Sequence, residues 1–418
     1  MEEWKEYKLG NILQISSGFA YKGKDIGYGN NCLLGMGCVS FKEKFLKSGI
    51  RNYNGDCPEK YCVKPNDMVL ATRQQSDNLP ILGMPAIIPD DLKGDKIIVG
   101  ANLYKVENKS DFDSQYIYWL LKSPSYVDYI RSCQTGTTVR MITKANIESY
   151  SFLAPNKKCR DRIVSILSSL DDKIEVNRRI NEQLEELAGA LFKSWFVDFE
   201  PFKDGGFVES ELGMIPEGWK VGTLGELCVT NKRTYGSKFS SEIAYLDTGS
   251  VTRNNIESLQ TLDPNKNKIP SRARRAVTEG DIVFSSVRPN QKHYAFLFNP
   301  QSNMVVSTGF VVITANWSGY RYFIYQYLIQ EDIIAKLQAI AEQSVSTYPS
   351  INATDITNLQ IVIPRRDVIG KFAEINLSFM NEINKNQREI SRLTTLRDTL
   401  LPKLMSGEIE VEQLNVIE

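Results

Sequence analysis

The chain has almost no histidine and no long hydrophobic segment. Only His293 is a histidine among 418 residues, which excludes most acid–base or metal schemes that would need a histidine in each half of the chain. No run of 18 apolar residues occurs, which argues against a membrane-spanning helix. The first residues, MEEWKEYK, are charged and lack the apolar core of a signal peptide.

The chain also lacks a net charge, because 50 Lys and Arg balance 50 Asp and Glu. A protein that coats nucleic acid without selectivity needs a large positive field. The composition argues against that function and leaves room for local basic patches.

Motifs of common enzymes are missing as well. We find no GxxxxGK(S/T) phosphate loop, no GxSxG elbow, no glycine-rich loop of the kind that binds S-adenosylmethionine, and no Asn/Asp-Pro-Pro-aromatic motif. The adjacent carboxylates Asp171 and Asp172 fall on a predicted helix, where we expect a solvated face. We therefore expect no catalytic residue and no cofactor in this chain.

What the chain does have is one pattern written twice. EEWKEYKLG (2–10) returns as EGWKVGTLG (217–225), 215 residues later. MITKANIESYSFLAP (141–155) returns as SINATDITNLQIVIP (350–364), at an offset of 209. A duplicated unit suggests a bipartite target or a pseudo-symmetric pair of partners.

The cysteines do not follow this repeat. Six of the seven fall in the first copy and only Cys228 falls in the second. A disulfide framework would recur with the repeat, so we expect a reduced, cytoplasmic protein. Cys57 and Cys62 lack the CxxC spacing of a zinc site, and we expect no metal.

Each copy has the features of a mixed α/β domain. Turn-bounded, β-branched stretches such as DMVLAT (67–72) predict strands. One helix is predicted near 114–130, with a counterpart at 320–337. We expect an α/β fold of two pseudo-repeated domains joined by two long helices. The boundaries follow from the repeat: a first domain at 1–155, a first long helix at 156–200, a linker at 201–218, a second domain at 219–364, and a second long helix with a tail at 365–418.

The two long helices share a seam. Apolar residues and Asn alternate at spacings of three and four, and Asn177 and Asn386 hold the same position in the two copies. An Asn in a seam costs stability but fixes register. We expect the helices to pack as an antiparallel coiled coil; the alternative is two unrelated amphipathic helices. The predicted pairing residues are Leu167, Leu170, Ile174, Asn177, Asn181, Leu184, Leu191, Phe379, Ile383, Asn386, Ile390, Leu393 and Leu400.

Each copy also ends one predicted strand with an arginine. DMVLATRQQ (67–75) matches DIVFSSVRPNQK (281–292), so that Arg73 aligns with Arg288 after a one-residue insertion. Arg, Gln and Lys are the side chains that make strong contacts to purine edges in the major groove. Base reading by these arginines is one hypothesis, and an ordinary surface ion pair is the alternative.

Two further kinds of segment fit DNA binding. PNKNKIPSRARRAV (264–277) holds five basic residues and no acid, which suits phosphate contact or else makes a solvated loop. QTGTTVRM (134–141) and EQSVSTYPS (342–350) are hydroxyl-rich loops that either bind phosphates and bases or cap the next helix. The candidate DNA contacts are Arg73, Gln74, Gln75, Thr137, Thr138, Arg140, Lys144, Arg233, Tyr235, Arg253, Arg272, Arg274, Arg275, Arg288, Lys292, Ser346 and Tyr348.

The duplication, the WKxxxLG opening and the Asn-bearing helix resemble the specificity subunit of type I restriction–modification systems. FKSWFVDFEPFK (192–203), followed by IPEGW (215–219), resembles the central region of that family. LLPKLMSGEIEV (400–411) resembles its C-terminal signature. The resemblance implies a non-catalytic chain whose two target recognition domains each read half of an asymmetric, bipartite sequence in double-stranded DNA.

The resemblance also implies partners. The long helices would space the two domains and dock two methyltransferase subunits, which carry S-adenosylmethionine and methylate adenine; a restriction and translocase subunit would join through them. We expect the methyltransferases to meet outward helix faces around Lys173, Arg178, Glu185, Lys193, Arg388 and Arg397. The alternatives are the recognition chain of another multi-subunit or split restriction–modification enzyme, and a coiled-coil scaffold without DNA selectivity.

Overall fold

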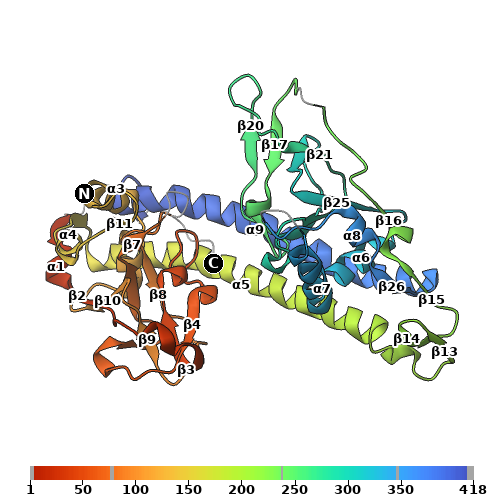
Figure 1. Ribbon diagram of the computed structural model, residues 1–418. Helices are drawn as coiled ribbons and strands as arrows, with labels where there is room; N and C mark the ends of the chain where they lie inside the picture. The colour runs from red at the N-terminus through yellow and green to blue at the C-terminus, as the bar shows by residue number, and fades with distance from the viewer. Residues whose placement is uncertain (1–3, 76–79, 237–238, 345–347, 412–418) are drawn as a thin grey trace. The chain divides into compact units, whose positions relative to one another are not determined.

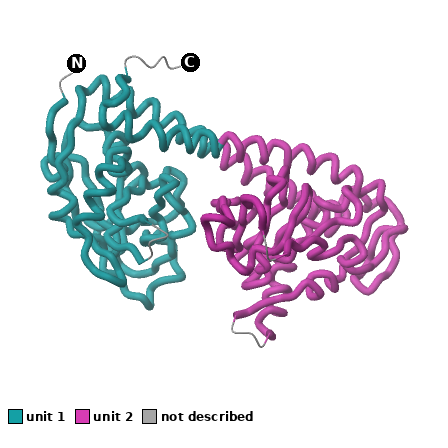
Figure 2. Tube along the Cα trace, turned by 90° about the horizontal axis from the view of Figure 1, so that it is seen from above, with its two compact units in different colours: residues 1–176, 390–418 teal, residues 177–389 magenta. Residues whose placement is uncertain are grey.

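The computed structural model describes residues 4–75, 80–236, 239–344 and 348–411. The chain forms two compact units, divided between Val176 and Asn177 and again between Glu389 and Ile390 (Figure 2). The long helices α5 (Lys157–Phe196) and α9 (Arg366–Ser406) each contribute one part to unit 1 and one part to unit 2. Each unit therefore holds one copy of the repeat together with a segment of both long helices.

Unit 1 contains the strands and short helices of the first copy (Figure 1). Its helices are α1 (Leu9–Ile12), α2 (Ser114–Leu120), α3 (Pro124–Cys133) and α4 (Lys144–Glu148). Its strands are β1 (Lys5–Lys8), β2 (Leu13–Ser17), β3 (Ile26–Leu34), β4 (Ile50–Tyr53), β5 (Cys62–Val63), β6 (Met68–Ala71), β7 (Arg73–Gln74), β8 (Pro85–Ile87), β9 (Ile97–Val99), β10 (Leu103–Asn108), β11 (Arg140–Met141) and β12 (Ser151–Ala154).

Unit 2 contains the corresponding elements of the second copy. Its short helices are α6 (Tyr320–Leu328), α7 (Glu331–Glu342), α8 (Ala353–Thr357) and the 3-10 turn η8 (Pro289–Gln291). Its strands are β13 (Phe207–Ser210), β14 (Gly213–Pro216), β15 (Lys220–Thr223), β16 (Cys228–Thr230), β17 (Ile243–Leu246), β18 (Val251–Thr252), β19 (Asn255–Ile256), β20 (Gln260–Leu262), β21 (Ala273–Ala276), β22 (Ile282–Ser285), β23 (Tyr294–Phe296), β24 (Met304–Ser307), β25 (Phe310–Ala315) and β26 (Gln360–Ile363).

The two units repeat the same sheets in the same register. The order β16-β25-β22-β23 matches β2-β10-β6-β8, and β20-β17-β24-β21 matches β4-β3-β9-β5. The parallel pair β17 and β24 corresponds to the parallel pair β3 and β9. Leu103 lies opposite Ala71, and Phe310 lies opposite Ser285 at the equivalent place. Since a one-residue slip would turn every side chain to the other face, both copies bury the same face. The expected pair of mixed α/β domains is confirmed.

The central strand of each unit is buried on both faces. In β6, Met68 and Leu70 belong to the apolar cluster that includes α2, whereas Val69 and Ala71 belong to the cluster that includes β9. Alternate residues of a strand point to opposite faces, which is why this strand is a continuous apolar run. The residues of β22 divide in the same way between two clusters of unit 2.

The helix expected near 114–130 is wrong in one respect, because two helices occupy this segment. Pro124 is the first residue of α3, and the extended backbone of Ser123 precedes it. Proline has no N–H to donate and fits only the first turn of a helix, so α2 cannot continue through it. In the second copy the break between α6 and α7 falls at Gln330, whose backbone is extended (ψ 141°).

In unit 2 the two long helices run antiparallel, as expected. Asn386 donates a hydrogen bond to Asn181 (2.9 Å), and Asn177 donates one to Glu389 (2.9 Å), so the contacted residue number in α9 rises as that in α5 falls. Asn177 and Asn386 are both buried, and each bonds a different polar partner across the seam. Of the other predicted pairing residues, Leu167, Ile174 and Ile383 are buried, and Leu170, Leu184, Leu191, Phe379, Ile390, Leu393 and Leu400 are half-buried.

In unit 1 the helices meet at a buried ion pair. Arg397 donates to Asp171 at 2.5 Å, and both side chains are less than a tenth exposed. The expectation that Asp171 lies on a solvated face is therefore wrong; Asp172, by contrast, is exposed. Burial became possible because Arg397 and Lys44, whose Nζ lies 3.6 Å from Asp171, supply the compensating charge.

Three further observations concern the described residues. All seven cysteines are free thiols. Within the described ranges, no helix has both the length and the apolar character to cross a membrane. The same residues contain no cluster of three or more side chains suited to hold a metal ion.

Candidate nucleic-acid interface

In unit 1 the structure brings the predicted DNA contacts to one edge. β7 follows directly on the buried strand β6 and pairs with β11, so that Arg73 lies opposite Met141 and Gln74 lies opposite Arg140. The backbone N–H of Ile142 donates to the carbonyl of Thr72 (3.1 Å). We call residues 72–75 and 135–144 the unit 1 edge; β7 and β11 are labelled in Figure 1. The candidates on it are Arg73, Gln74, Gln75, Thr137, Thr138, Arg140 and Lys144.

The two faces of this edge differ. Arg73 is exposed and shares its face with Met141, which is 40% exposed. Gln74 is buried, and its Oε1 accepts the N–H of Leu82 (3.3 Å). Because neighbouring residues of a strand point to opposite faces, Arg73 is free to face a ligand outside while Gln74 and Arg140 face inward.

Unit 2 has an equivalent edge, made by residues 286–292 and 348–351. Ile351 donates to the carbonyl of Ser286 (2.8 Å), as Ile142 does to Thr72 in unit 1, and Arg288 donates to the carbonyl of Pro349 (3.0 Å). A loop before a short helix thus meets the end of the central strand in both copies. The one-residue insertion expected from the sequence is wrong: Val287 bridges to Ser350 as Arg73 pairs with Met141, so Arg288 lies one residue further along, at the place of Gln74 in unit 1.

Arg288 has an uncommon backbone conformation at this edge. Its φ is 49° and its ψ is 68°, in the left-handed region, which costs a non-glycine residue of the order of 1 kcal/mol. The hydrogen bonds to Pro349 and from Gln291 hold it there. Its guanidinium lies 5.3 Å from the ring centre of Tyr348, which is 57% exposed. The strained backbone and the ring together orient an exposed arginine.

The remaining candidates of unit 2 form two other groups. The Lys292 ammonium is mostly buried and forms an ion pair with Glu331, while its carbonyl accepts the N–H of Arg253 (2.9 Å) at the turn of the β18–β19 hairpin. Arg233 binds the buried carboxylate of Asp281 at 2.9 Å. These contacts give Lys292 and Arg233 a structural role within the unit.

The basic segment lies along β21. The carbonyl of Arg274 accepts the N–H of Tyr235, and the Arg274 guanidinium donates to the carbonyl of Gly236 (2.7 Å). Burial lowers the pKa of Arg275. Arg272 is exposed. The candidate Ser346 lies outside the described residues.

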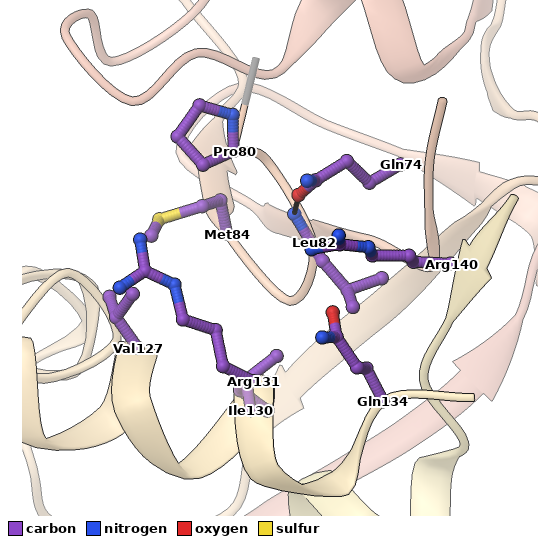
Figure 3. Close-up of a pocket in the computed structure, with 9 residues that line it drawn as sticks. All are labelled: Gln74, Pro80, Leu82, Met84, Val127, Ile130, Arg131, Gln134 and Arg140. Atoms are coloured by element: carbon purple, nitrogen blue, oxygen red, sulfur yellow. Dashed lines mark hydrogen bonds between the residues drawn. The ribbon is translucent and has the colours of Figure 1, made fainter. Parts of the chain in front are cut away.

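The inward face of the unit 1 edge borders a cavity that sequence reasoning missed. The cavity has a volume of about 250 Å³. Figure 3 shows Arg131 reaching it from α3 and Gln134 from the residue directly after α3, with Gln74 and Arg140 on the other side. Its lining residues are Gln74, Pro80, Leu82, Met84, Val127, Ile130, Arg131, Gln134 and Arg140. The sequence did contain a signal for this cavity. Four of its lining residues are spaced so that they share one helical face: Val127, Ile130, Arg131 and Gln134. This spacing can be recognised only once the start of α3 at Pro124 is known.

Two residues expected on the outward faces of the long helices turn inward. Glu185 accepts hydrogen bonds from Asn254 (2.5 Å) and Tyr325 (3.2 Å), and burial raises its pKa. Arg397 forms its ion pair with Asp171. The expectation that these two side chains meet a partner subunit is wrong, because each bonds within its own unit.

Comparison with known proteins gives these edges a context. The family model for the type I restriction modification DNA specificity domain matches residues 1–186 and 216–392. The type I restriction enzyme MjaIX specificity subunit of Methanocaldococcus jannaschii is 29% identical over 434 residues, which cover 99% of this chain and 95% of that protein. The HindI specificity subunit of Haemophilus influenzae is 27% identical over 475 residues, covering 98% and 100%. Among solved structures, the S subunit of a type I restriction–modification system from M. genitalium matches with a TM-score of 0.55 at 15% identity, over 97% of this chain and 96% of that one. At this identity the match supports the fold alone.

Proposed function

The chain belongs to the family of type I restriction–modification DNA specificity proteins, and we propose that it reads an asymmetric, bipartite sequence in double-stranded DNA. A DNA-recognition role in a restriction–modification complex is favoured over the two alternatives, because the relatives described above are specificity subunits. The observation that carries the proposal is the repetition of one edge: each unit presents an arginine where its central strand meets the loop before a short helix. Two such edges suit a target made of two specified blocks.

Within each edge, Arg73 and Arg288 would read bases. Arginine donates a bidentate pair of hydrogen bonds to guanine O6 and N7, the commonest specific contact in the major groove. Stacking on Tyr348 reduces the conformational freedom that Arg288 would lose on binding. Thr137, Thr138, Lys144 and Arg272 are exposed and would position the DNA through its phosphates.

Methyltransferase subunits would dock on the long helices, two to each chain, and a restriction and translocase subunit would join through them. Exposed apolar side chains on these helices support this: Val176 and Leu187 of α5 and Leu377 and Leu396 of α9 are each more than 40% exposed. These side chains offer apolar contact points to a partner, because the burial of exposed apolar surface is favourable. In this arrangement the present chain is non-catalytic, and S-adenosylmethionine binds to its partners.

The test is to coexpress the chain with its neighbouring methyltransferase gene and to map modified adenines across the host genome. A single motif of two short specified blocks around an unspecified spacer supports the proposal. An assembled complex that leaves the genome unmodified, or that modifies it without selectivity, would favour a scaffold instead.

A further inference from the structure

The cavity behind the unit 1 edge is lined by side chains that have no part in the proposed reading of base edges by Arg73. Five of its lining residues, namely Pro80, Leu82, Met84, Val127 and Ile130, are apolar. The other four, Gln74, Arg131, Gln134 and Arg140, carry N–H donors; Arg131 also forms an exposed ion pair with Asp128 (3.3 Å), and no carboxylate is among the nine described lining residues. Apolar walls with several convergent donors suit a flat, apolar-faced group whose edge is rich in acceptors.

A nucleobase has that chemistry. Its two faces are apolar enough to pack between side chains, and its edge offers carbonyl oxygens and ring nitrogens to Arg and Gln. A base of roughly ten non-hydrogen atoms occupies roughly 150–200 Å³ at the packing density of organic solids. The cavity, at about 250 Å³, is large enough for one base.

The concave shape of the cavity indicates whether the bound base would be stacked in the duplex or unstacked from it. The edges of stacked bases lie at the bottom of a major groove about 8.5 Å deep, where only a protruding side chain reaches them. A concave site receives groups that protrude, so it fits a base that has left the helix. We propose that the cavity lined by Gln74, Arg131, Gln134 and Arg140 takes one unstacked nucleobase of the half-site read by unit 1. This rests on the proposed function.

The second copy explains why the site belongs to the first half-site. Between β6 and β8 the first copy has thirteen residues (72–84), whereas between β22 and β23 the second has eight (286–293). The longer segment supplies four of the cavity's lining residues. The shorter one folds into η8, whose Asn290 N–H donates to Gln338 of α7 (3.3 Å). Gln338 stands at the position of Arg131, 207 residues later, so this helix face is occupied by the chain itself.

The experiment uses the complete complex of this chain with its methyltransferase partners and a duplex carrying the mapped motif. 2-Aminopurine, a base whose fluorescence rises when it leaves the stack, replaces the bases of the first half-site one at a time on each strand. We expect a rise of several-fold at one position other than the base that becomes methylated. Gln134→Phe, which fills the cavity from its rim, should return that emission to the level of the free duplex.

Two matched variants keep the result interpretable. Ser132→Phe adds the same ring to the same helical turn, but Ser132 is exposed and is not one of the lining residues, so the rise should persist. Arg131→Ala removes a donor without filling the space and should reduce the emission and weaken binding of that half-site. A rise that survives Gln134→Phe, or one confined to the methylated base, would overturn the cavity proposal while selective methylation leaves the proposed function standing. A complex that binds DNA without selectivity would remove the proposed function itself.

Discussion

The buried ion pair of Asp171 and Arg397 can be tested against the second copy of the same chain. At the offset of 209 the position of Asp171 corresponds to Met380, and that of Arg397 corresponds to Ala188. Both of these residues are buried, with 5% and 2% of their surface exposed. Unit 1 therefore has a buried ion pair where unit 2 has a buried apolar residue at each of the two corresponding positions. The perturbation is to give unit 1 the pair of unit 2, through Asp171→Met and Arg397→Ala, singly and together.

The structure sets the size of each effect. Removing one partner of a buried pair costs about 3–5 kcal/mol, because the other charge stays buried without compensation. For Arg397→Ala we expect about 3 kcal/mol, at the lower end, since Lys44 stays 3.6 Å from Asp171. Replacing both partners by apolar side chains is often neutral or stabilising, so the double variant should lie within about 1 kcal/mol of the parent chain. The coupling energy, which is the sum of the two single costs less the cost of the double variant, is then about 5 kcal/mol.

The measurement is hydrogen exchange followed by mass spectrometry of segments 157–176 and 390–406. These segments belong to unit 1, so their opening free energy reports this unit even where the two units unfold separately. A double variant as unstable as the sum of the two singles would refute the reasoning, because additive costs mean that the two side chains do not stabilise each other.

Three further predictions follow from other contacts. Arg288→Ala should reduce discrimination at one base pair of the second half-site by about 1–3 kcal/mol, roughly ten- to a hundredfold; methylation mapping checks it, and an unchanged motif contradicts it. Because burial raises the pKa of Glu185, the folded chain favours its protonated form, and stability should fall as pH rises from the unfolded value of about 4.3 through the folded pKa. Glu185→Gln keeps an acceptor for Asn254 but cannot ionise. The melting temperature of this variant should therefore change less with pH over this range, and a pH profile identical to that of the parent chain would count against a role for Glu185 ionisation. Asn386→Leu removes the hydrogen bond to Asn181 and should permit other helix pairings, seen as added oligomers in light scattering; an unchanged mass would contradict it.

The long helices and the two-domain organisation could be predicted because their signals are periodic or repeated. α5 spans Lys157–Phe196 where the sequence predicts a helix at 156–200, since spacings of three and four extend along its whole length. The burial of Asp171 could not be predicted, because its partner lies 226 residues away and no local pattern records the pairing. Asp171 and Asp172 look equally solvated until the second helix is placed beside the first.

The candidate DNA-binding site likewise has a part that could be predicted from the sequence and a part that could not. The repeated strand located both edges, but the alignment of Arg73 with Arg288 is wrong by one residue, because Val287 pairs with Ser350 as Arg73 pairs with Met141. The sequence did not separate Arg73 from Gln74, which the alternation of a short strand sends to opposite faces. Nor did it show that Lys292 and Arg233 bond to Glu331 and Asp281, since both ion pairs join segments far apart in the chain.

A difference in length between the two copies shows which segment of the domain can vary without disturbing the sheets. The register of the sheet pairs is the same in both units, so the scaffold tolerates no slip. The segment that follows the central strand nevertheless differs by five residues, 72–84 against 286–293, and it carries Arg73 in one copy and Arg288 in the other. A surface loop can gain residues at little cost in free energy, whereas a paired strand cannot. The two half-sites are therefore expected to be read by unlike surfaces, a cavity edge in unit 1 and a stacked arginine in unit 2, held by the same frame. Exchanging segment 72–84 for 286–293 should alter the first specified block of the methylated motif and leave the second unchanged; loss of both blocks would mean that the segments also support the frame.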